Sequence, residues 1–337
     1  MADVVLEVKD LKTYLFLASG VVKAVDGVSF GIERGKTLGI VGESGSGKSM
    51  TASSIMRLLP KKIGKVVEGE INFNGKDVLT FNSKELLEFR GKDVVLISQD
   101  PMTSLDPVFK VGAQMVEMIR AHQDISVEEA KALSIESLKK VGIPNPESRM
   151  NSYPYELSGG MCQRVIIAMA ITAQPKLVIA DEPTTALDVT VQAQVLNLLK
   201  EMQQNLDTSI MLITHNLGIV WEMCDDVMVM YAGKTVEYTS AKELYSEALH
   251  PYTWGLLESI PKLSHESKSE LTTIPGTPPD LRLTGEACNF HNRCPYAIPI
   301  CSEKVPELLE IKEGHFVACH RQTKESTLAR GEEFGDV

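Results

Sequence analysis

The sequence has no long apolar run that is free of charged residues. Hydrophobic residues make up 43% of its 337 residues, yet no uncharged stretch reaches the roughly eighteen apolar residues that a membrane-spanning helix needs. The first ten residues, MADVVLEVKD, lack the basic segment and the continuous apolar core of a signal peptide. We therefore expect a protein that is made and kept in the cytosol, so that any membrane-spanning helices come from another chain.

Basic residues are in the minority. Lys and Arg number 34 against 45 Asp and Glu, which gives a formal net charge of -11. This acidic balance argues against non-specific binding to nucleic acid or to anionic lipid. The sequence also lacks internal repeats and low-complexity tracts, and its composition is not that of a disordered or fibrous chain. A chain of this length can bury one large core, or a core and a smaller domain.

Short apolar segments without alternation occur at 94–98, 177–180 and 210–213. Strands that are buried on both faces have this pattern, and helical segments separate the three, which is typical of a parallel sheet with crossover helices. Segments near the N-terminus, at 4–8 and 25–32, predict an additional antiparallel β part. The sequence thus predicts an α/β fold with a largely parallel central sheet.

Two changes of pattern predict the domain organisation. Between about residues 110 and 145 the pattern becomes helical, where Ser126 and Glu129 form a capping box and Gly142 ends a helix. Prolines accumulate after about residue 245 and periodicity fades, which places a boundary near residue 250. The expected parts are a domain over 1–249 with a helical subdomain over about 105–165, a small irregular Cys-rich C-terminal domain over 250–325 and a flexible terminus over 326–337.

A glycine-rich segment fits the pattern G-x-x-x-x-G-K-[ST]. It consists of Gly42, Glu43, Ser44, Gly45, Ser46, Gly47, Lys48 and Ser49. The segment follows an apolar strand and opens a helix expected over 50–59, which is the context that a phosphate-binding loop requires. Glycines let several backbone N–H groups and the helix N-terminus point at a phosphate. We predict that the chain binds a nucleoside triphosphate, with Lys48 at the β- and γ-phosphates and Ser49 on Mg²⁺.

Two carboxylates, Asp181 and Glu182, follow the apolar strand LVIA. In an open parallel sheet, ligands gather at the carboxyl ends of the strands, so we expect this pair beside the phosphate loop. Asp181 is predicted to hold Mg²⁺ through water, and Glu182 to polarise the attacking water as a general base. An Asp-Glu pair after a strand means little alone, but together with a phosphate loop it strongly indicates a site that binds and hydrolyses a nucleoside triphosphate.

A second anion cradle is predicted at the start of another helix, where Ser158, Gly159 and Gly160 precede the run MCQRVIIAMAI. The segment LSGGM resembles the signature LSGGQ of ATP-binding cassette (ABC) proteins, with Met161 in place of the usual Gln. In that family two ATPase domains pair head to tail, and each signature caps the γ-phosphate held by the other. The resemblance therefore implies a second ATPase of the same family.

Three further motifs occur in the order that ABC proteins have. Gln99 matches the Q-loop residue, which senses Mg²⁺ and the attacking water. The D-loop is matched by Ala186, Leu187 and Asp188, and His215 matches the H-loop histidine that contacts the γ-phosphate. The resemblance thus implies catalytic roles for Gln99, Glu182 and His215.

The residue that stacks on adenine in ABC proteins is expected near residue 15, which is Leu15. Tyr14 and Phe16 flank it. Neighbouring strand residues point to opposite faces, so only one frame presents a ring to the base, and Tyr14 is our candidate. The alternative is that both rings are packing residues.

Three segments, QDPMTSLDP at 99–107, LSGGM at 157–161 and HPYT at 250–253, resemble the ATPase subunits of dipeptide and oligopeptide importers. A single cassette without a membrane segment excludes a fused exporter. The resemblance covers the whole chain and implies ATP-driven import at the cytoplasmic face of the cell membrane. It implies a homologous ATPase, two permease subunits and an extracytoplasmic solute-binding protein as partners. Nickel complexes and peptide pheromones are alternative cargoes.

Four of the six cysteines lie near the end of the chain: Cys288, Cys294, Cys301 and Cys319. No C-x-x-C pair occurs, so neither the usual zinc ribbon nor a ferredoxin pattern is present. Disulfides are rare in a reducing cytosol, so the clustering predicts four thiolates at one metal site. The segment CNFHNRCP resembles the cysteine motif of peptide-importer ATPase tails, which implies a four-iron four-sulfur cluster, with Zn²⁺ as the alternative. A redox-responsive regulator is a competing functional class.

Overall fold

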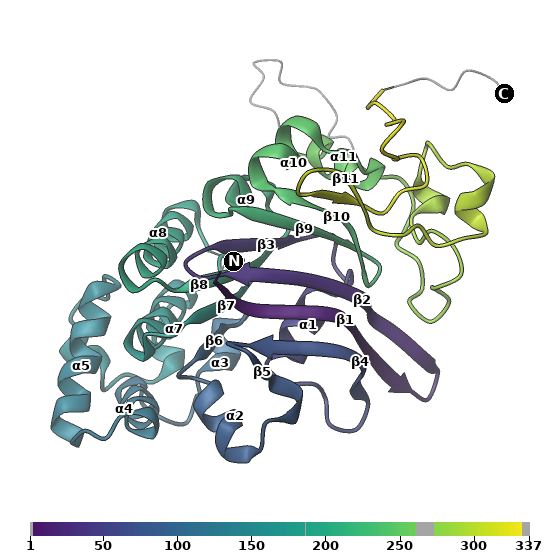
Figure 1. Ribbon diagram of the computed structural model, residues 1–337. Coiled ribbons are helices and arrows are strands. Elements are labelled where there is room, and N and C mark those ends of the chain that lie inside the picture. Colours follow the sequence, from purple (N-terminus) through teal and green to yellow (C-terminus); the bar gives the residue numbers. More distant parts are fainter. Residues whose placement is uncertain (1–2, 186, 261–272, 332–337) are drawn as a thin grey trace, which may run out of the picture. The chain divides into compact units, whose positions relative to one another are not determined.

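The computed structural model describes residues 3–185, 187–260 and 273–331 (Figure 1). Ala186 of the predicted D-loop and residues 332–337 of the predicted terminus lie outside this part. The described chain forms two compact units, each assembled from segments that are far apart in the sequence. Among the described residues, unit 1 comprises 3–6, 31–37, 72–185 and 187–213, and unit 2 comprises 7–30, 38–71, 214–260 and 273–331.

Unit 1 contains a parallel three-stranded sheet. Its strands are β6 (Val94–Ile97), β7 (Leu177–Asp181) and β8 (Ser209–Thr214), in the order β6-β7-β8. All residues of β8 and all but the last of β7 are buried. The apolar segments predicted as buried parallel strands are therefore confirmed. Asp181 stands at the carboxyl end of β7, opposite Ile213.

Helices make up most of the rest of unit 1. They are α2 (Ser83–Phe89), α3 (Pro101–Ser104), α4 (Val111–His122), α5 (Val127–Lys140), α6 (Pro146–Arg149), α7 (Gly159–Ala173) and α8 (Val189–Leu206). Helices α4, α5 and α7 pack against one another (Figure 1). The predicted capping box is confirmed, because Ser126 Oγ accepts from Glu129 N at 3.1 Å and the Glu129 carboxylate accepts from Ser126 N at 2.8 Å. Gly142 follows α5 with a φ of 70°.

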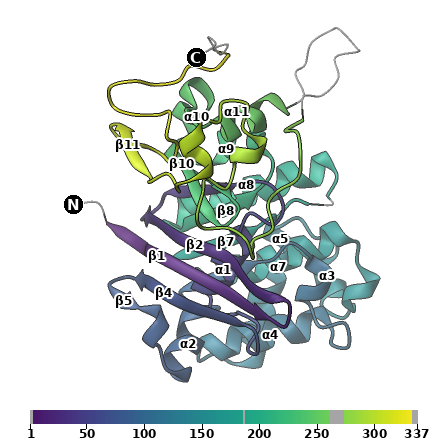
Figure 2. The same ribbon diagram turned by 90° about the vertical axis from the view of Figure 1, so that its right-hand side faces the viewer.

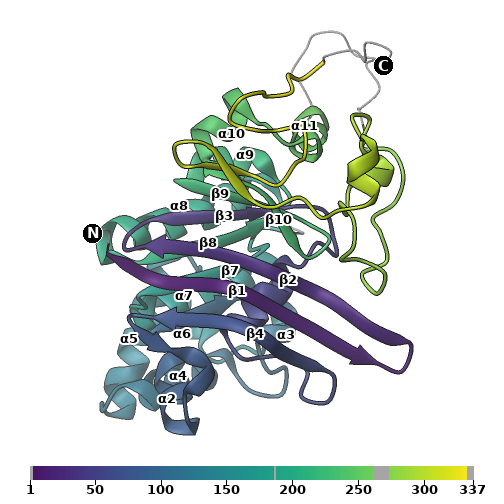
Figure 3. The same cartoon turned by 45° about the vertical axis from the view of Figure 1, so that its right-hand side comes forward.

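Unit 2 contains a mixed sheet in the order β11-β12-β10-β9-β3. Its strands are β3 (Thr37–Val41), β9 (Asp226–Tyr231), β10 (Lys234–Ser240), β11 (Leu309–Lys312) and β12 (His315–Val317). Strands β3 and β9 are parallel, and the other pairs are antiparallel. The hairpin of β11 and β12 therefore continues this sheet through β10 (Figure 3). A separate irregular Cys-rich domain is thus not confirmed.

The N-terminal strands are longer than predicted and contribute to both units. They are β1 (Val4–Leu17), β2 (Gly20–Glu33), β4 (Gly64–Phe73) and β5 (Lys76–Asp77), and β1 and β2 are the long purple strands of Figure 2. The order in this sheet is β2-β1-β4-β5. The sequence pattern predicted only residues 4–8 of β1 and 25–32 of β2, and it missed β4 and β5.

The described α-helices of unit 2 are α1 (Lys48–Ile55), α9 (Leu217–Met223), α10 (Ala241–Glu247) and α11 (Pro251–Glu258). Two short 3-10 helices, η3 (His291–Arg293) and η4 (Pro299–Ser302), lie in the segment that contains the cysteines. The prediction that α1 runs to Leu59 was wrong. Helix α1 ends at Ile55, and Arg57 adopts a left-handed backbone with a φ of 51°. A proline at residue 60 excludes a helix beyond it but does not specify where the helix stops. No helix in the described part of the chain is both long and apolar enough to span a bilayer.

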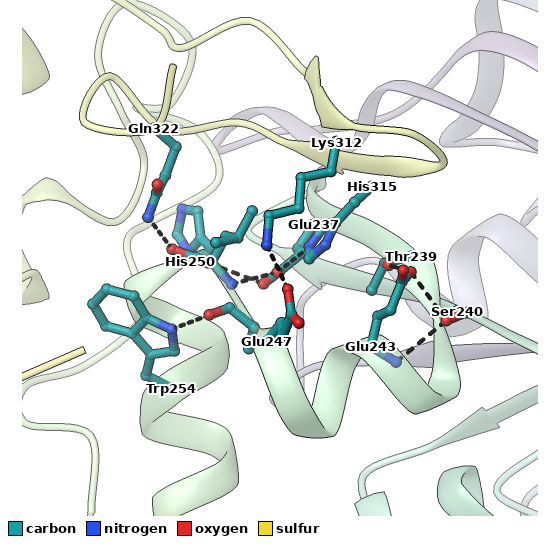
Figure 4. A network of polar contacts seen from close by, with 12 residues as sticks. Glu237, Thr239, Ser240, Glu243, Glu247, His250, Trp254, Lys312, His315 and Gln322 are labelled. Atoms are coloured by element: carbon teal, nitrogen blue, oxygen red, sulfur yellow. Dashed lines mark hydrogen bonds and ion pairs between the residues drawn. The ribbon is translucent and has the colours of Figure 1, made fainter. Parts of the chain in front are cut away.

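Glu237 of β10 is fully buried and joins three segments of unit 2 (Figure 4). Its carboxylate accepts from the backbone N–H groups of Leu249 at 2.7 Å and His250 at 3.1 Å, and it lies 2.8 Å from His315 Nε2 in β12. His250 caps α11, because its Nδ1 accepts from Tyr252 N at 3.0 Å. Burial lowers the pKa of His250 to about 4, so its imidazole is neutral at pH 7. The buried carboxylate thus ties β12 and α11 to β10.

Candidate functional site

The glycine-rich loop connects β3 to α1 in unit 2. Its three glycines have positive φ angles: 152° at Gly42, 79° at Gly45 and 108° at Gly47. A Cβ atom on Gly42 would lie 2.2 Å from the carbonyl oxygen of Met230, and one on Gly47 would lie 2.4 Å from that of Ala24. These two positions require glycine, because a side chain would collide with backbone and the left-handed conformation would be strained. The surrounding backbone therefore holds the loop in its curved form.

Lys48 is only 5% exposed and points into the loop. Its ammonium group donates to the carbonyl oxygens of Gly42 at 2.8 Å and Glu43 at 2.9 Å, and it lies 3.5 Å from Ser46 Oγ. A phosphate oxygen is a stronger, charged acceptor than a carbonyl, so the ammonium is placed to exchange these partners for a phosphate. Ser49 follows in the first turn of α1.

A cavity of about 310 Å³ opens beside the loop in unit 2. Its wall combines loop residues, the segment before α9 and the end of α11, and it comprises Val41, Gly42, Glu43, His215, Asn216, Leu217, Leu256, Ser259 and Ile260. The structure therefore brings His215 and the phosphate loop, two separately predicted parts of the site, to one cavity.

Tyr14 lies in β1, and its hydroxyl group donates to Asp26 Oδ1 at 2.8 Å. Burial, followed by the hydrogen bond with Asp26, raises the pKa of Tyr14 to about 12. Asp26 is also 3.0 Å from the ammonium of Lys234. Phe16 is 42% exposed, and the ammonium of Lys65 lies 5.6 Å from its ring centroid. The assignment of adenine stacking to Tyr14 stays a prediction, and Phe16 has the more exposed ring.

Glu182 follows β7 in unit 1 with a left-handed backbone, at a φ of 48°. Its N–H donates to the carbonyl oxygen of Ile213 at 2.9 Å. Its Oε2 accepts from Gln99 Nε2 at 3.0 Å and from Thr185 Oγ1 at 2.8 Å. The structure thus brings Gln99 and Glu182 together directly after Asp181. Sequence reasoning missed Thr185, although a hydroxyl group three residues after a carboxylate was a local signal for such a contact.

The signature residues begin α7 in unit 1. Ser158 is the N-cap, and its Oγ accepts from the backbone N–H three residues later at 3.3 Å. A Cβ atom on Gly159 would meet nothing within 4 Å, whereas one on Gly160 would lie 3.1 Å from Val191 Cγ1. Asp188 is the N-cap of the next helix, α8, and accepts from Val191 N at 3.0 Å. The open space at Gly159 leaves the start of α7 accessible to a ligand.

The four tail cysteines lie in one neighbourhood of unit 2. Cys288 N donates to the carbonyl oxygen of Cys301 at 2.9 Å. Burial, with smaller contributions from the thiols of Cys319, Cys288 and Cys301, raises the pKa of Cys294 to about 12. The four thiols are therefore close enough to interact electrostatically. In the described part of the chain, however, no three or more His, Cys, Asp or Glu side chains are arranged to hold a metal ion. The predicted metal site is thus not shown.

Sequence reasoning also missed two residues that contact the phosphate loop. Tyr252 accepts a hydrogen bond from the backbone N–H of Glu43, and Arg293 forms an ion pair with the Glu43 carboxylate. Both residues stand in segments that carried the resemblance to importer ATPases. Nothing in those segments indicated a contact with the loop, because the partners are 209 and 250 positions apart.

Two family matches cover much of the chain. Residues 25–185 match the ABC transporter family, and residues 236–301 match the oligopeptide/dipeptide transporter, C-terminal region. The oligopeptide transport ATP-binding protein of Bacillus subtilis (strain 168) is 51% identical over 312 residues, which are 93% of this chain and 87% of that protein. The chain belongs to the family of ABC transporter ATP-binding proteins. The oligopeptide transport ATP-binding protein of Escherichia coli (strain K12) is 47% identical over 324 residues, which are 96% of this chain and 95% of that protein.

A solved structure of the same family supports the fold. It is a subunit of an ABC transporter complex from Clostridium perfringens, is 29% identical, and superimposes with a TM-score of 0.60 over 73% of this chain and 92% of its own. The predicted resemblance and the mixed α/β cassette fold are therefore confirmed. Family members hydrolyse ATP to power transport, and this chain is an ATPase of that kind.

Proposed function

We propose that this chain hydrolyses ATP to power the import of oligopeptides and dipeptides, as a peripheral ATPase subunit on the cytoplasmic face of a membrane transporter. The observation that carries this proposal is the match of residues 236–301 to the C-terminal region of oligopeptide/dipeptide transporters. The chain would pair head to tail with a homologous ATPase. Two permease subunits and an extracytoplasmic solute-binding protein would complete the transporter.

Residues of the phosphate loop and residues at the end of β7 have different roles in binding and hydrolysing ATP. Lys48 binds the β- and γ-phosphates, which replace its present carbonyl partners. The hydroxyl of Ser49, the amide of Gln99 and the carboxylate of Asp181 are oxygen donors of the kind that Mg²⁺ prefers. Mg²⁺ held by these groups would neutralise charge on the phosphates. Glu182, oriented by Gln99, accepts a proton from the attacking water.

The remaining motifs act on the γ-phosphate. His215, in the cavity beside the loop, donates to it from the same chain. Ser158, Gly159 and Gly160 cradle the γ-phosphate held by the paired ATPase, which is supported by the accessible N-terminus of α7. Asp188 begins α8, and Val191 of that helix lies beside Gly160 of the signature. One chain therefore supplies parts to two nucleotide sites.

Deletion of the gene is expected to abolish uptake of a labelled tripeptide by cells of its own source organism. Wild-type protein supplied from a plasmid should restore uptake, and the Lys48→Ala variant should not, because it lacks the ammonium that binds the phosphates. Uptake of the corresponding free amino acid serves as the control and should not change. Unchanged tripeptide and dipeptide uptake together with loss of nickel uptake would contradict the peptide cargo.

We also propose that Cys288, Cys294, Cys301 and Cys319 hold a four-iron four-sulfur cluster, with Zn²⁺ as the alternative. The support is a set of four soft thiol ligands whose side chains interact electrostatically. A cation among them would offset the mutual repulsion of four thiolates, and a tetrathiolate set suits both iron–sulfur clusters and zinc. Such a cluster would either stabilise the C-terminal region or respond to redox state.

Protein purified without oxygen is expected to show visible iron–sulfur absorbance and to contain iron and acid-labile sulfide in equal amounts. The Cys294→Ser variant should lose both, because a hydroxyl group is a poor ligand for the cluster. The matched control is Cys162→Ser, a change at a buried cysteine of α7 that is not among the four. Stoichiometric zinc without iron would contradict the cluster. ATPase activity that follows the oxidation state would indicate a sensor, whereas lower stability alone would indicate a structural role.

A further inference from the structure

Glu43, the second residue of the phosphate loop, is held at both its backbone and its side chain by the C-terminal part of unit 2. Its N–H donates to the hydroxyl group of Tyr252 in α11 at 2.8 Å. Its carboxylate accepts from the Nη1 and Nη2 atoms of Arg293 at 2.6 and 3.0 Å. Arg293 directly precedes Cys294. The cysteine-containing segment therefore contacts the phosphate loop directly.

Arg293 is built into this position. Its side chain is only 5% exposed. Nε donates to the carbonyl oxygen of Pro275 at 2.9 Å, Nη2 to that of Ile274 at 3.2 Å, and Nη1 to the hydroxyl group of Tyr231 at 3.3 Å. With the two bonds to Glu43, these contacts use all five N–H donors of a guanidinium group. A lysine could not reproduce this planar, bidentate arrangement.

The aromatic rings beside these groups pack into one cluster. The ring centroids of Tyr231 and Tyr252 are 4.6 Å apart, and Phe290 lies 5.2 Å from the first and 5.4 Å from the second. Tyr252 is fully buried, and the guanidinium carbon of Arg293 lies 5.7 Å from the Tyr231 ring centroid, within cation–π range. Packing therefore fixes both the hydroxyl group and the guanidinium that hold Glu43.

We propose that Arg293 and Tyr252 are positioning residues for ATP binding, which hold the phosphate loop in shape and neutralise the carboxylate that the loop carries. The inference rests on the proposed role of the loop in binding ATP. Glu43 places a negative charge in a loop whose ligand is a polyphosphate anion, and like charges at short range oppose binding. The ion pair with Arg293 cancels this charge. The bond to Tyr252 fixes the adjoining peptide unit.

Nucleotide affinity separates this role from a merely structural one. In a titration of the purified full-length chain with a fluorescent ATP analogue and Mg²⁺, Arg293→Gln is expected to weaken binding on the order of tenfold, because Glu43 regains its charge. The double variant Arg293→Gln/Glu43→Gln should bind almost as tightly as wild type, since it carries neither charge. The affinity of Arg293→Lys for the analogue should lie between that of Arg293→Gln and that of wild type. In the assembled transporter, KM for ATP should rise for Arg293→Gln while kcat changes little.

The matched control is Arg282→Gln, which removes an exposed arginine of the same region whose partner is Asp280. Its affinity for the analogue should equal that of wild type. The inference is overturned if Arg293→Gln binds as tightly as wild type, or if the double variant is as weak as the single one. If the wild-type chain does not bind the ATP analogue at all, the proposed function is refuted. That outcome differs from tight binding by both wild type and Arg293→Gln, which would refute only the role of Arg293. Arg293→Lys keeps the test decisive if Arg293→Gln does not fold.

Discussion

The Glu182→Gln variant is expected to hydrolyse ATP at least about a hundredfold more slowly than wild type in the assembled transporter, because an amide cannot accept the proton of the attacking water. This substitution should remove the proton acceptor and leave the surrounding hydrogen bonds largely intact. Glu182 Oε2 accepts from Gln99 and Thr185, and a glutamine side chain has the same shape with one oxygen left to accept. Phosphate release measured at saturating ATP reports the loss, and equilibrium binding of ATP should not weaken.

A matched control for this variant is Glu201→Gln, which changes an exposed carboxylate on α8. Its rate of hydrolysis should equal that of wild type. If Glu182→Gln hydrolysed ATP as fast as Glu201→Gln, Glu182 would not be the general base. If it lost ATP binding as well as hydrolysis, the substitution would have disturbed the site and its rate could not be assigned to proton transfer.

The Glu237→Leu variant is expected to lower the free energy of unfolding by about 3–5 kcal/mol. Removal of this fully buried carboxylate leaves the N–H groups of Leu249 and His250 without their acceptor and separates His315 from its partner. A buried N–H group without an acceptor is destabilising, because no hydrogen bond in the protein replaces those that the group made to water in the unfolded chain. Urea unfolding at pH 7, followed by the signal of Trp254 near the start of α11, should report the change.

Glu247→Gln provides the comparison for this loss. Glu247 forms its ion pair with Lys312 at the surface, where both side chains are about half exposed. Exposed pairs contribute less than about 1 kcal/mol, so this variant should unfold almost like wild type. Equal stability of the two variants would show that Glu237 does not join β10, β12 and α11 in the way that Figure 4 indicates.

The nucleotide motifs could be predicted from the sequence because their physics is local. Gly42 and Gly47 have no space for a Cβ atom, and the lysine that follows is held by loop carbonyls only a few residues away. The capping box of Ser126 and Glu129 is local in the same sense, since both hydrogen bonds span three residues. The buried parallel strands could also be predicted from the sequence, because a continuous apolar segment indicates a strand that is buried on both faces.

The predictions that failed, or were never made, concern contacts between distant segments. The C-terminal hairpin joins β10 because Glu237 and Tyr238 pair with Val317 and Phe316, which no local pattern announces. Clustering of four cysteines in the sequence indicated a metal site, but their arrangement in the described residues does not show one.

The sequence by itself determined that this chain is an ABC-type ATPase, because the glycine-rich loop and the signature segment each consist of particular residues at fixed short spacings. Only the tertiary structure decided that Arg293 and Tyr252 hold Glu43 of the phosphate loop, across 250 and 209 positions of sequence. The physical reason is that short-range backbone geometry is written in neighbouring residues. The pairing of a buried charge depends instead on which distant side chains the packed core brings within hydrogen-bond distance.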